Sequence, residues 1–341
     1  MPIKRVEQAI EDIKHGKMVV MIDDEDRENE GDLVYAATFS TPEKVNFMAT
    51  EAKGLICVAI SKEIAKRLKL EPMVQNNDSQ HETAFTVSVD AKEATTGISA
   101  YERDMTIKLL ANPLSSPADF VRPGHIFPLI AKEGGVLVRT GHTEGSVDIC
   151  RLAGLAPSAV ICEIMREDGQ MARRDDLEIF AKKHGLNIVY ISDIVEYRLL
   201  NERLVHERGE EEIDFFGTKV LKKSFEDHQK KVHHAVIFYK VHETENVKFH
   251  NIGTDVDLLL NTAKFNQLIN SIEYLKKNGG VLIFLDSQDA AGETMKEYGI
   301  GAQILAELGI KNIKLLVSSK GREFVGLGGF GLDIVEEIEV K

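Results

Sequence analysis

The sequence predicts an α/β (α+β) protein with two domains, and three observations support this prediction. The chain has 341 residues, more than a single ordinary hydrophobic core usually organises. Apolar runs of strand length alternate with stretches of helical periodicity in both halves of the chain. The charged segment DIVEYRLLNERLVHERGEEE (193–212) lies between the halves. We expect this segment to be a helix that contains the domain boundary.

In the first half, strand-length apolar runs recur between helical stretches. The predicted strands are KMVVMI (17–22), DLVYAAT (32–38), GLICVAI (54–60), AFTVSVD (84–90), SAVICEIM (158–165) and LNIVYIS (186–192). The predicted helices cover 3–16, 41–53, 61–70, 141–155 and 175–185, and Thr41 followed by a proline is typical of a helix start. Residues 111–128 contain four prolines, so we expect a long irregular loop there, of the kind that is usually functional or disordered.

The second half repeats the mixed pattern. We expect strands at VHHAVIFYK (232–240), VLIFLD (281–286) and NIKLLVSS (312–319), and helices over about 257–277 and 300–308. Neither an internal repeat nor a low-complexity tract is present.

Composition excludes several classes of protein. The net charge of −13 argues against a broad nucleic-acid-binding surface. No apolar run approaches the ~20 residues that a membrane span requires. The first ten residues, MPIKRVEQAI, contain acid and lack the features of a signal peptide. The three cysteines, Cys57, Cys150 and Cys162, form no CxxC pair, so we expect reduced thiols, a cytoplasmic protein and no structural zinc site.

The most unusual segment is DDEDRENEGD (23–32), in which seven carboxylates are accompanied by a single cation, Arg27. It joins two predicted core strands, and strand ends are where α/β enzymes build their sites. So much like charge requires full solvation or a bound cation, and these ligands suit Mg²⁺ or Mn²⁺. An EF-hand is excluded, because a loop starting at Asp26 has Ala37 at its twelfth position. A solvated acidic loop remains the alternative.

Three further stretches are candidate site elements. RTGHTEGS (139–146) opens a predicted helix whose free N–H groups suit a phosphate, although an ordinary capped helix is the simpler interpretation. His142 in this stretch could complete a metal site with a carboxylate of the acidic loop. His125 lies in a Pro-Gly turn, and Glu163 lies in an apolar strand, where a carboxylate is uncommon without a partner.

Together these motifs resemble one enzyme family. DDEDRENEGD, TTGISA (95–100), RPGHIFPL (122–129), GGVLVRTGHTEGSVDICRLAGL (134–155), ICEIM and DGQMAR (168–173) are similar to 3,4-dihydroxy-2-butanone 4-phosphate synthase of riboflavin biosynthesis, over roughly residues 1–205. The resemblance implies an N-terminal domain of residues 1–206 with a mixed sheet layered with helices. It also implies a homodimer with sites near the subunit interface. The implied reaction converts D-ribulose 5-phosphate to the named product and formate, using Mg²⁺ or Mn²⁺, with two divalent cations per site.

The resemblance also assigns residues to roles. Glu28 and His142 would bind metal, whereas Arg27, Asp32, Arg139, Thr143 and Glu163 would bind substrate, and His125, Glu163 and Glu30 would serve catalysis. Metal ions can hold the enediolate oxygens, and carboxylates or histidine can move the protons. One departure follows TTGISA, where Glu102 replaces the family's usual Asp, and we expect little effect because the charge is retained.

The second half, about residues 213–341, resembles GTP cyclohydrolase II in EYGIGAQILAELGIKNIKLLVSS (297–319) and GLGGFGLDIVEEI (326–338). That family binds catalytic zinc through three cysteines, but no cysteine follows Cys162. The family's EGRGIGL segment is reduced to SQDAAGET (287–294), and residues 318–321 read Ser-Ser-Lys-Gly where the family has Thr-Asn-Asn-Pro. His233 and His234 point to opposite faces if they lie in a strand. We therefore predict a domain without cyclohydrolase activity. A bifunctional enzyme and a regulatory binding module remain alternatives.

Overall fold

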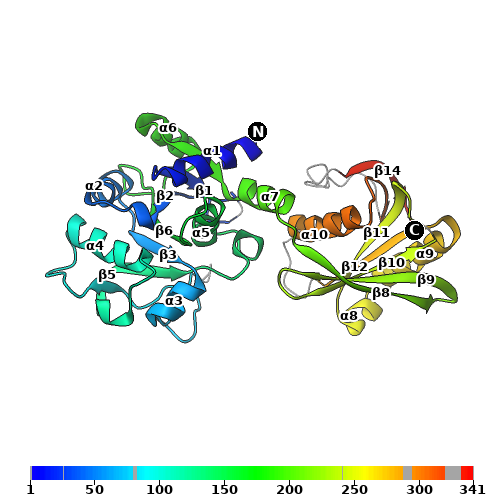
Figure 1. The fold of residues 1–341 in the computed structure, drawn as a ribbon. Helices are drawn as coiled ribbons and strands as arrows, with labels where there is room; N and C mark the ends of the chain where they lie inside the picture. Colours follow the sequence, from blue (N-terminus) through cyan, green and yellow to red (C-terminus); the bar gives the residue numbers. More distant parts are fainter. Residues whose placement is uncertain are drawn as a thin grey trace. The chain divides into compact units, whose positions relative to one another are not determined.

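The computed structural model describes residues 2–25, 27–79, 83–239, 241–286, 294–318 and 332–340, without the side chains of 294–298. The chain divides into two compact units, Met1–Tyr197 and Arg198–Lys341. Each unit contains one seven-stranded sheet with helices packed on it (Figure 1). Among the described residues, no helix is both long and apolar enough to cross a membrane.

The sheet of the first unit has the strand order β4-β5-β3-β6-β2-β1-β7. Its strands are β1 (Val19–Ile22), β2 (Gly31–Ala36), β3 (Cys57–Ile60), β4 (Val89–Ala91), β5 (Phe120–Ile130), β6 (Ser158–Glu163) and β7 (Asn187–Tyr190). The β1–β7 and β3–β5 pairs are parallel and the other pairs are antiparallel. The predicted mixed sheet is therefore present.

Helices cover both faces of this sheet. They are α1 (Pro2–Lys14), α2 (Pro42–Phe47), α3 (Lys62–Leu68), α4 (Ala100–Ala111), α5 (His142–Leu152), α6 (Arg174–His184) and α7 (Ile191–Asn201), with short helical turns at 37–39, 48–52, 117–119 and 135–137. Alternate strand residues such as Leu33, Val58 and Val160 form the main core with α2 and α4. Helix α5 packs against β1, β2, β3 and β6, and its residues 142–150 are all buried. The functional motif at the start of α5 therefore lies inside the unit.

Two predictions for the first unit were wrong. Residues 120–128 of the expected irregular loop belong to β5, the longest strand of this sheet. Proline fits an extended backbone and lacks only its N–H donor, so Pro123 and Pro128 are tolerated in this strand, which pairs with the three-residue edge strand β4. AFTVSVD contributes mainly isolated bridges at Phe85 and Thr86 before β4 begins at Val89.

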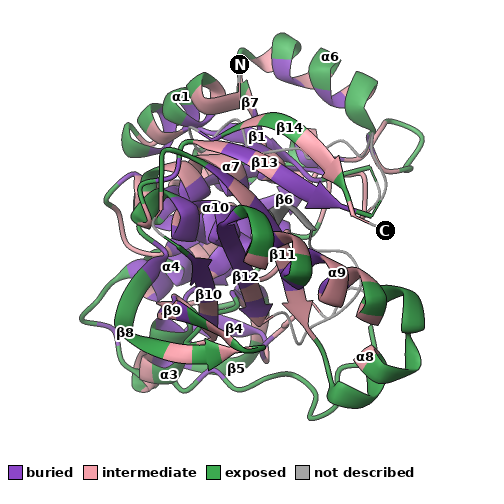
Figure 2. Cartoon of the chain, turned by 90° about the vertical axis from the view of Figure 1, so that its right-hand side faces the viewer, coloured by how far each residue is buried: buried purple, intermediate pink, exposed green. Residues whose placement is uncertain are grey.

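The charged segment 193–212 is not one helix. Helix α7 ends at Asn201, and β8 (Val205–Phe215) follows. The acidic side chains of β8 pair across the sheet with lysines of β9, as in Lys222–Glu211 and Lys223–Glu207. A pattern of charge that suits a solvated helix suits an exposed strand equally well, and β8 is exposed along most of its length (Figure 2).

The sheet of the second unit has the order β14-β13-β11-β12-β10-β9-β8. The remaining elements are β9 (Thr218–Asp227), β10 (Val232–Phe238), β11 (Thr244–Ile252), β12 (Gly280–Asp286), β13 (Asn312–Val317), β14 (Asp333–Glu339), α8 (Asp255–Leu260), α9 (Thr262–Asn278) and α10 (Thr294–Glu307). Strands β9, β11 and β14 were not predicted. The single helix predicted over 257–277 is divided at Asn261, whose side chain caps α9. The predictions for 287–293 and 319–321 lie outside the described residues.

Candidate active site

The acidic loop between β1 and β2 is folded around one of its own carboxylates, Asp23. This side chain is buried, and its Oδ1 atom accepts a hydrogen bond from the Glu30 N–H at 2.8 Å. Its Oδ2 atom accepts from the Glu28 N–H at 3.1 Å and from Nη1 of Arg27 at 2.8 Å. The sequence analysis left Asp23 without a role, because hydrogen bonds to backbone N–H groups leave no sequence pattern. Its only signal is its position directly after the strand.

Arg173, at the start of α6, holds the same loop from the other side. Its Nη1 atom donates to the carbonyl oxygens of Glu28 at 2.7 Å and Asn29 at 2.5 Å. Arg173 belongs to the DGQMAR motif, but the sequence analysis assigned it no function. Two carbonyls and a carboxylate therefore fix the backbone from which the Glu28 and Glu30 side chains project.

Glu28, Asp32 and His142 meet beside the start of α5. Glu28 Oε2 lies 3.5 Å from Nδ1 of His142, and Asp32 Oδ1 lies 4.0 Å from Nε2 of the same ring. Arg27 reaches Glu28 Oε2 at 2.9 Å. Asp32 and His142 are both buried. They are more than a hundred residues apart in the sequence, and the fold brings them together.

The charges of this cluster are strongly coupled. Burial disfavours the charged form of Glu28, but contact with His142 and the charge of Arg27 outweigh it and lower the pKa of Glu28 to about 2. Burial raises the pKa of Asp32, with Glu163 adding to the rise and His142 opposing it. For His142, burial is outweighed by the carboxylates of Asp32 and Glu28, so its pKa is raised. The histidine is the positive partner of the acids around it.

These residues fit a divalent cation. One ligand atom each from Asp23, Glu28 and His142 lie within 4.8 Å of one another, the one such group found among the described residues. Asp32 Oδ1 and His142 Nε2 are buried and have no hydrogen-bond partner within the described part of the chain. Carboxylate oxygens with one imidazole suit Mg²⁺ or Mn²⁺, and a cation would take the place of the proton on His142.

A positive region adjoins this cluster at the first turn of α5. The guanidinium groups of Arg139 and Arg27 both lie against Gly141. A Cβ atom added to this glycine would be 2.2 Å from Nη1 of Arg139 and 3.1 Å from Nη2 of Arg27. Glu144 orients Arg139 through a 2.6 Å hydrogen bond to its Nη1 atom. Thr143 is buried in the same turn. Two guanidinium groups at a helix N-terminus form a suitable environment for a phosphate.

Glu163 ends β6 next to Asp32, its partner in the β2–β6 register. Its Oε2 atom accepts a hydrogen bond from the Leu55 N–H at 2.8 Å. A Cβ atom on Gly54 would lie 2.7 Å from Glu163 Oε2, so the glycine allows this close approach. Glu30 is half-buried, and its pKa is raised by burial and by the charge of Glu28.

His125 is separate from these residues. Its strand β5 pairs with β3 through Cys57 and Phe127. Extending that register by two residues places His125 beside Leu55, and hence about two strand spacings, ~10 Å, from Glu163. The ring instead contacts Asp90, with Nδ1 2.7 Å from Oδ2. The structure therefore gathers the other predicted site residues and leaves His125 on β5, which β3 separates from β6 and Glu163.

Comparison with known proteins identifies the family of the chain. The family model described as 3,4-dihydroxy-2-butanone 4-phosphate synthase matches residues 7–197, more than half of the chain. The chain belongs to this synthase family. The synthase of Sulfurospirillum multivorans is 63% identical to it over 339 residues, covering 99% of this chain and 95% of the relative. The predicted family and its function in riboflavin biosynthesis are confirmed by this similarity.

Of two similar solved structures, one extends the comparison to both units of the chain. The two-domain synthase RibBX of A. baumannii is 39% identical with a TM-score of 0.83, covering 99% of each chain. A synthase structure described as a complex with two magnesium ions is 43% identical with a TM-score of 0.54, covering 56% of this chain and 94% of that one. The model described as GTP cyclohydrolase II matches only residues 287–339. The predicted two-domain α/β fold is confirmed.

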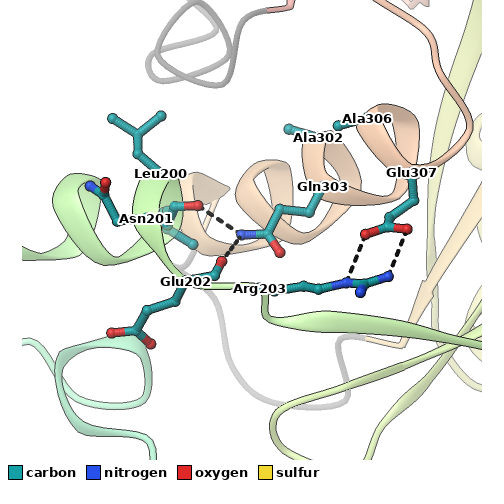
Figure 3. Close-up of a pocket in the computed structure, with 9 residues that line it drawn as sticks. Leu200, Asn201, Glu202, Arg203, Ala302, Gln303, Ala306 and Glu307 are labelled. Carbon is teal, nitrogen blue, oxygen red and sulfur yellow. Dashed lines mark hydrogen bonds and ion pairs between the residues drawn. The ribbon is translucent and has the colours of Figure 1, made fainter.

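The second unit, which begins at Arg198 in the last turn of α7, has a surface cavity of about 410 Å³ lined by residues 199–203 and by α10 (Figure 3). Gln303 joins its walls by donating to the carbonyls of Leu199 at 2.7 Å and Glu202 at 2.8 Å. Arg203 pairs with Glu307 at its edge. The lining residues include neither histidine nor cysteine, and their polar groups are used in holding the two helices together.

Proposed function

We propose that the chain converts D-ribulose 5-phosphate to 3,4-dihydroxy-2-butanone 4-phosphate and formate. One observation carries the proposal: a buried centre of Glu28, Asp32 and His142 adjoins two arginines at the start of α5. A sugar phosphate has oxygens that suit the first group and a phosphate that suits the second. A single ligand can therefore satisfy both halves of the site.

The positive region binds the phosphate end of the substrate. Arg139 and Thr143 act here together with the free N–H groups of the first turn of α5. Arg27 links this end to the acidic centre, because its guanidinium group contacts both Glu28 and the space beside Gly141. Asp32 binds substrate hydroxyl groups through the Oδ1 atom that has no partner within the described part of the chain.

Glu28 and His142 would hold the divalent metal, Mg²⁺ or Mn²⁺, with two such ions at each site. A bound ion would supply Lewis-acid polarisation of the substrate carbonyl. No zinc is expected, because the nearby ligands are mainly carboxylate oxygens rather than thiolates. Asp23 holds the loop in shape with three hydrogen bonds, and this arrangement limits its freedom to act as a strong ligand.

The remaining side chains move protons. The reaction must remove a proton next to a carbonyl, lose water, migrate a carbon and release formate, so it needs several acid–base groups. Asp32 and Glu163 lie side by side on neighbouring strands, and paired carboxylates can divide acid and base roles. Glu30 lines the centre, and His125 supplies a further base from β5.

The enzyme acts as a homodimer with its sites near the subunit interface. Apolar side chains on the loop before α4, on α4 itself and on β5 are exposed, namely Ile98 at 54%, Tyr101 at 72% and Val121 at 45%. A contact with a second copy would cover this apolar surface. The three cysteines are free and buried, which is consistent with the proposed cytoplasmic location.

The C-terminal domain, residues 213–341, does not hydrolyse GTP. The absence of any cysteine after Cys162 supports this, because a zinc hydrolase without its ligands cannot activate water. A bifunctional enzyme is the alternative, and a regulatory binding role for this domain is a second one.

The test is an assay of the purified full-length protein with D-ribulose 5-phosphate, measuring formate with and without EDTA. Formate release that EDTA stops, and that Mg²⁺ restores, is the expected result. Full activity in EDTA would contradict the metal site, and no activity with added Mg²⁺ and Mn²⁺ would contradict the function. Release of pyrophosphate from GTP by the same sample would support the bifunctional alternative.

A further inference from the structure

His125 is held by a buried carboxylate from the adjacent edge strand. Asp90 of β4 is 6% exposed, and its Oδ1 atom accepts the backbone N–H of His125 at 2.8 Å. Its Oδ2 atom lies 2.7 Å from Nδ1 of the ring. The β4–β5 register shifts at this point, from Val89–Ile126 to Asp90–Val121. The carboxylate therefore occupies a break in strand pairing and contacts His125 twice.

The contact at Nδ1 fixes the tautomer of the neutral imidazole, and the backbone contact fixes the position of the residue. A carboxylate can only accept, so the ring must donate from Nδ1, and this leaves Nε2 as the basic nitrogen. The His125 side chain is 44% exposed, and no described residue hydrogen-bonds to Nε2. A carboxylate that fixes the tautomer and direction of a histidine is a common way to prepare that ring for its role.

A glycine of the TTGIS loop (95–99) covers this pair. A Cβ atom on Gly97 would lie 2.0 Å from Asp90 Oδ2 and 2.6 Å from Nδ1 of His125, and the residue has a φ of +82°. Only glycine fits such a position. The backbone of the loop thus lies directly against the hydrogen bond between Asp90 and His125.

Glu102 holds this loop in place. Its carboxylate accepts the backbone N–H groups of Thr95 at 2.6 Å, Thr96 at 3.2 Å and Gly97 at 3.1 Å. Hydrogen bonds from Thr95 first, and then from Thr96 and Ser99, lower the pKa of Glu102 to about 2. The carboxylate that replaces the family's usual Asp therefore has a defined structural task beside the Asp90–His125 pair.

We propose that Asp90 is a positioning residue for His125, which it holds with Nδ1 protonated and Nε2 free to exchange a proton with the substrate. The inference rests on the proposed role of His125 in the reaction. The competing explanation is that Asp90 only closes the break between β4 and β5. The two explanations differ in what they predict for the ring itself.

The test is Asp90→Asn in the full-length enzyme. The Asn oxygen can still accept the His125 N–H, but its NH₂ group donates to Nδ1 and so favours the opposite tautomer. We expect kcat for formate release to fall by ~10²-fold or more, a loss within the range of acid–base catalysis. KM for D-ribulose 5-phosphate and the Mg²⁺ concentration for half activity should change less than about threefold, because the substitution leaves the groups that bind substrate and metal in the ground state unchanged. ¹⁵N NMR of the His125 ring should report the change of tautomer.

Ser88→Ala is the matched control. Ser88 Oγ accepts the Gly124 N–H at 3.1 Å in the same break between β4 and β5, without contacting the ring. If Asp90 acts through His125, Ser88→Ala should leave kcat within about threefold, since it removes one neutral hydrogen bond. An equal loss of kcat in Ser88→Ala and Asp90→Asn would overturn the proposal in favour of the structural explanation.

A double-mutant cycle with His125→Ala completes the test. In the His125→Ala background, Asp90→Asn should cause no further loss of kcat, because the ring on which it acts is gone. Additive losses, or an unchanged tautomer in Asp90→Asn, would contradict the positioning role. A fully active His125→Ala would instead refute the proposed role of His125, and an inactive wild type would refute the proposed function. The NMR measurement distinguishes these outcomes because it needs no turnover.

Discussion

Each unit of the molecule contains a buried histidine beside carboxylates, and the two histidines are treated very differently. In the second unit, His233 Nε2 lies 3.2 Å from Asp227 Oδ2, and its Nδ1 accepts the Asp286 N–H at 3.1 Å. Asp227 Oδ1 accepts two further backbone N–H groups, from Gln229 and Lys231. Both ring nitrogens are satisfied, so this histidine joins β9, β10 and β12 and has no nitrogen left for a ligand.

In the first unit, His142 has acids around it but poor hydrogen bonds to them. The nearest carboxylate oxygens are 3.5 Å from Nδ1 and 4.0 Å from Nε2. Leaving a buried ring nitrogen and a buried carboxylate oxygen without a hydrogen-bond partner costs free energy. This arrangement is therefore explained by a ligand that completes it. Residue types alone do not distinguish the two histidines, but their hydrogen-bond geometry does.

The largest expected effect comes from exchanging these histidines for glutamine. His142→Gln should lower formate release by more than the ~100-fold that loss of an outer-shell partner causes, because it removes a proposed metal ligand. His233→Gln should leave formate release within about twofold but lower the free energy of unfolding by about 1–3 kcal/mol, the cost of leaving a buried partner unsatisfied. Formate assays and chemical denaturation of both variants measure this. The distinction between a ligand-binding His142 and a structural His233 is wrong if His142→Gln stays active, or if His233→Gln loses activity without losing stability.

A smaller loss is expected from Asp23→Asn. The new NH₂ group cannot accept the N–H groups that Asp23 now binds, so the loop that presents Glu28 should loosen. We expect formate release to fall by about 10–100-fold and the Mg²⁺ concentration for half activity to rise. Glu25→Gln is the control, because this exposed residue of the same loop forms an ion pair with Arg174 at 3.2 Å and with no other residue of the described part of the chain. Equal losses in both variants would show that the charge of the loop matters rather than its shape.

Sequence reasoning was most successful where the signal is local. The strand before Asp23, the helix that starts at His142 and the buried strand that ends at Glu163 were all predicted, because apolar periodicity and cap residues act within a few residues. Residue roles came from the resemblance, since the meeting of Asp32 with Glu163 depends on the register of β2 and β6. That register is set by the whole sheet and leaves no local pattern.

The misses have a common physical cause. Arg173 and Asp23 work by hydrogen-bonding to backbone groups, which any residue can supply. Strand β5 was interpreted as a loop because its prolines remove donors, yet Pro128 still offers its carbonyl to the Thr86 N–H at 2.9 Å. Strand β8 was interpreted as part of a helix because its glutamates pair with lysines on a neighbouring strand that the sequence analysis did not predict.

The smallest expected effect concerns Lys248, a buried cation in the second unit. Replacing it tests how well that unit tolerates a buried charge without an ion-pair partner. Lys248 is 8% exposed, and no carboxylate within the described residues forms an ion pair with its Nζ atom, which donates to the Leu316 carbonyl at 3.5 Å. Burial lowers the pKa of Lys248 to about 8 from an ordinary value of 10.5. The folded protein therefore binds this proton less tightly than the unfolded chain does.

The sign of the pH dependence follows from that difference. Between pH of about 8 and 10.5, the unfolded chain keeps the proton and the folded protein has lost it, so the free energy of unfolding rises with pH. Lys248→Met keeps an unbranched side chain without the amine, so it should raise the free energy of unfolding at pH 7 by about 1–3 kcal/mol. That gain should shrink above pH 10.

Lys314→Met is the control, because it removes an exposed ion pair with Glu336. It should change the free energy of unfolding by less than ~0.5 kcal/mol. Chemical denaturation of the unmodified protein and the two variants at pH 7 and pH 10 measures these changes. If Lys248→Met is less stable than the unmodified protein at pH 7, the prediction is wrong, and the amine stabilises the fold by hydrogen-bonding to nearby carbonyls, as His233 does with its partners.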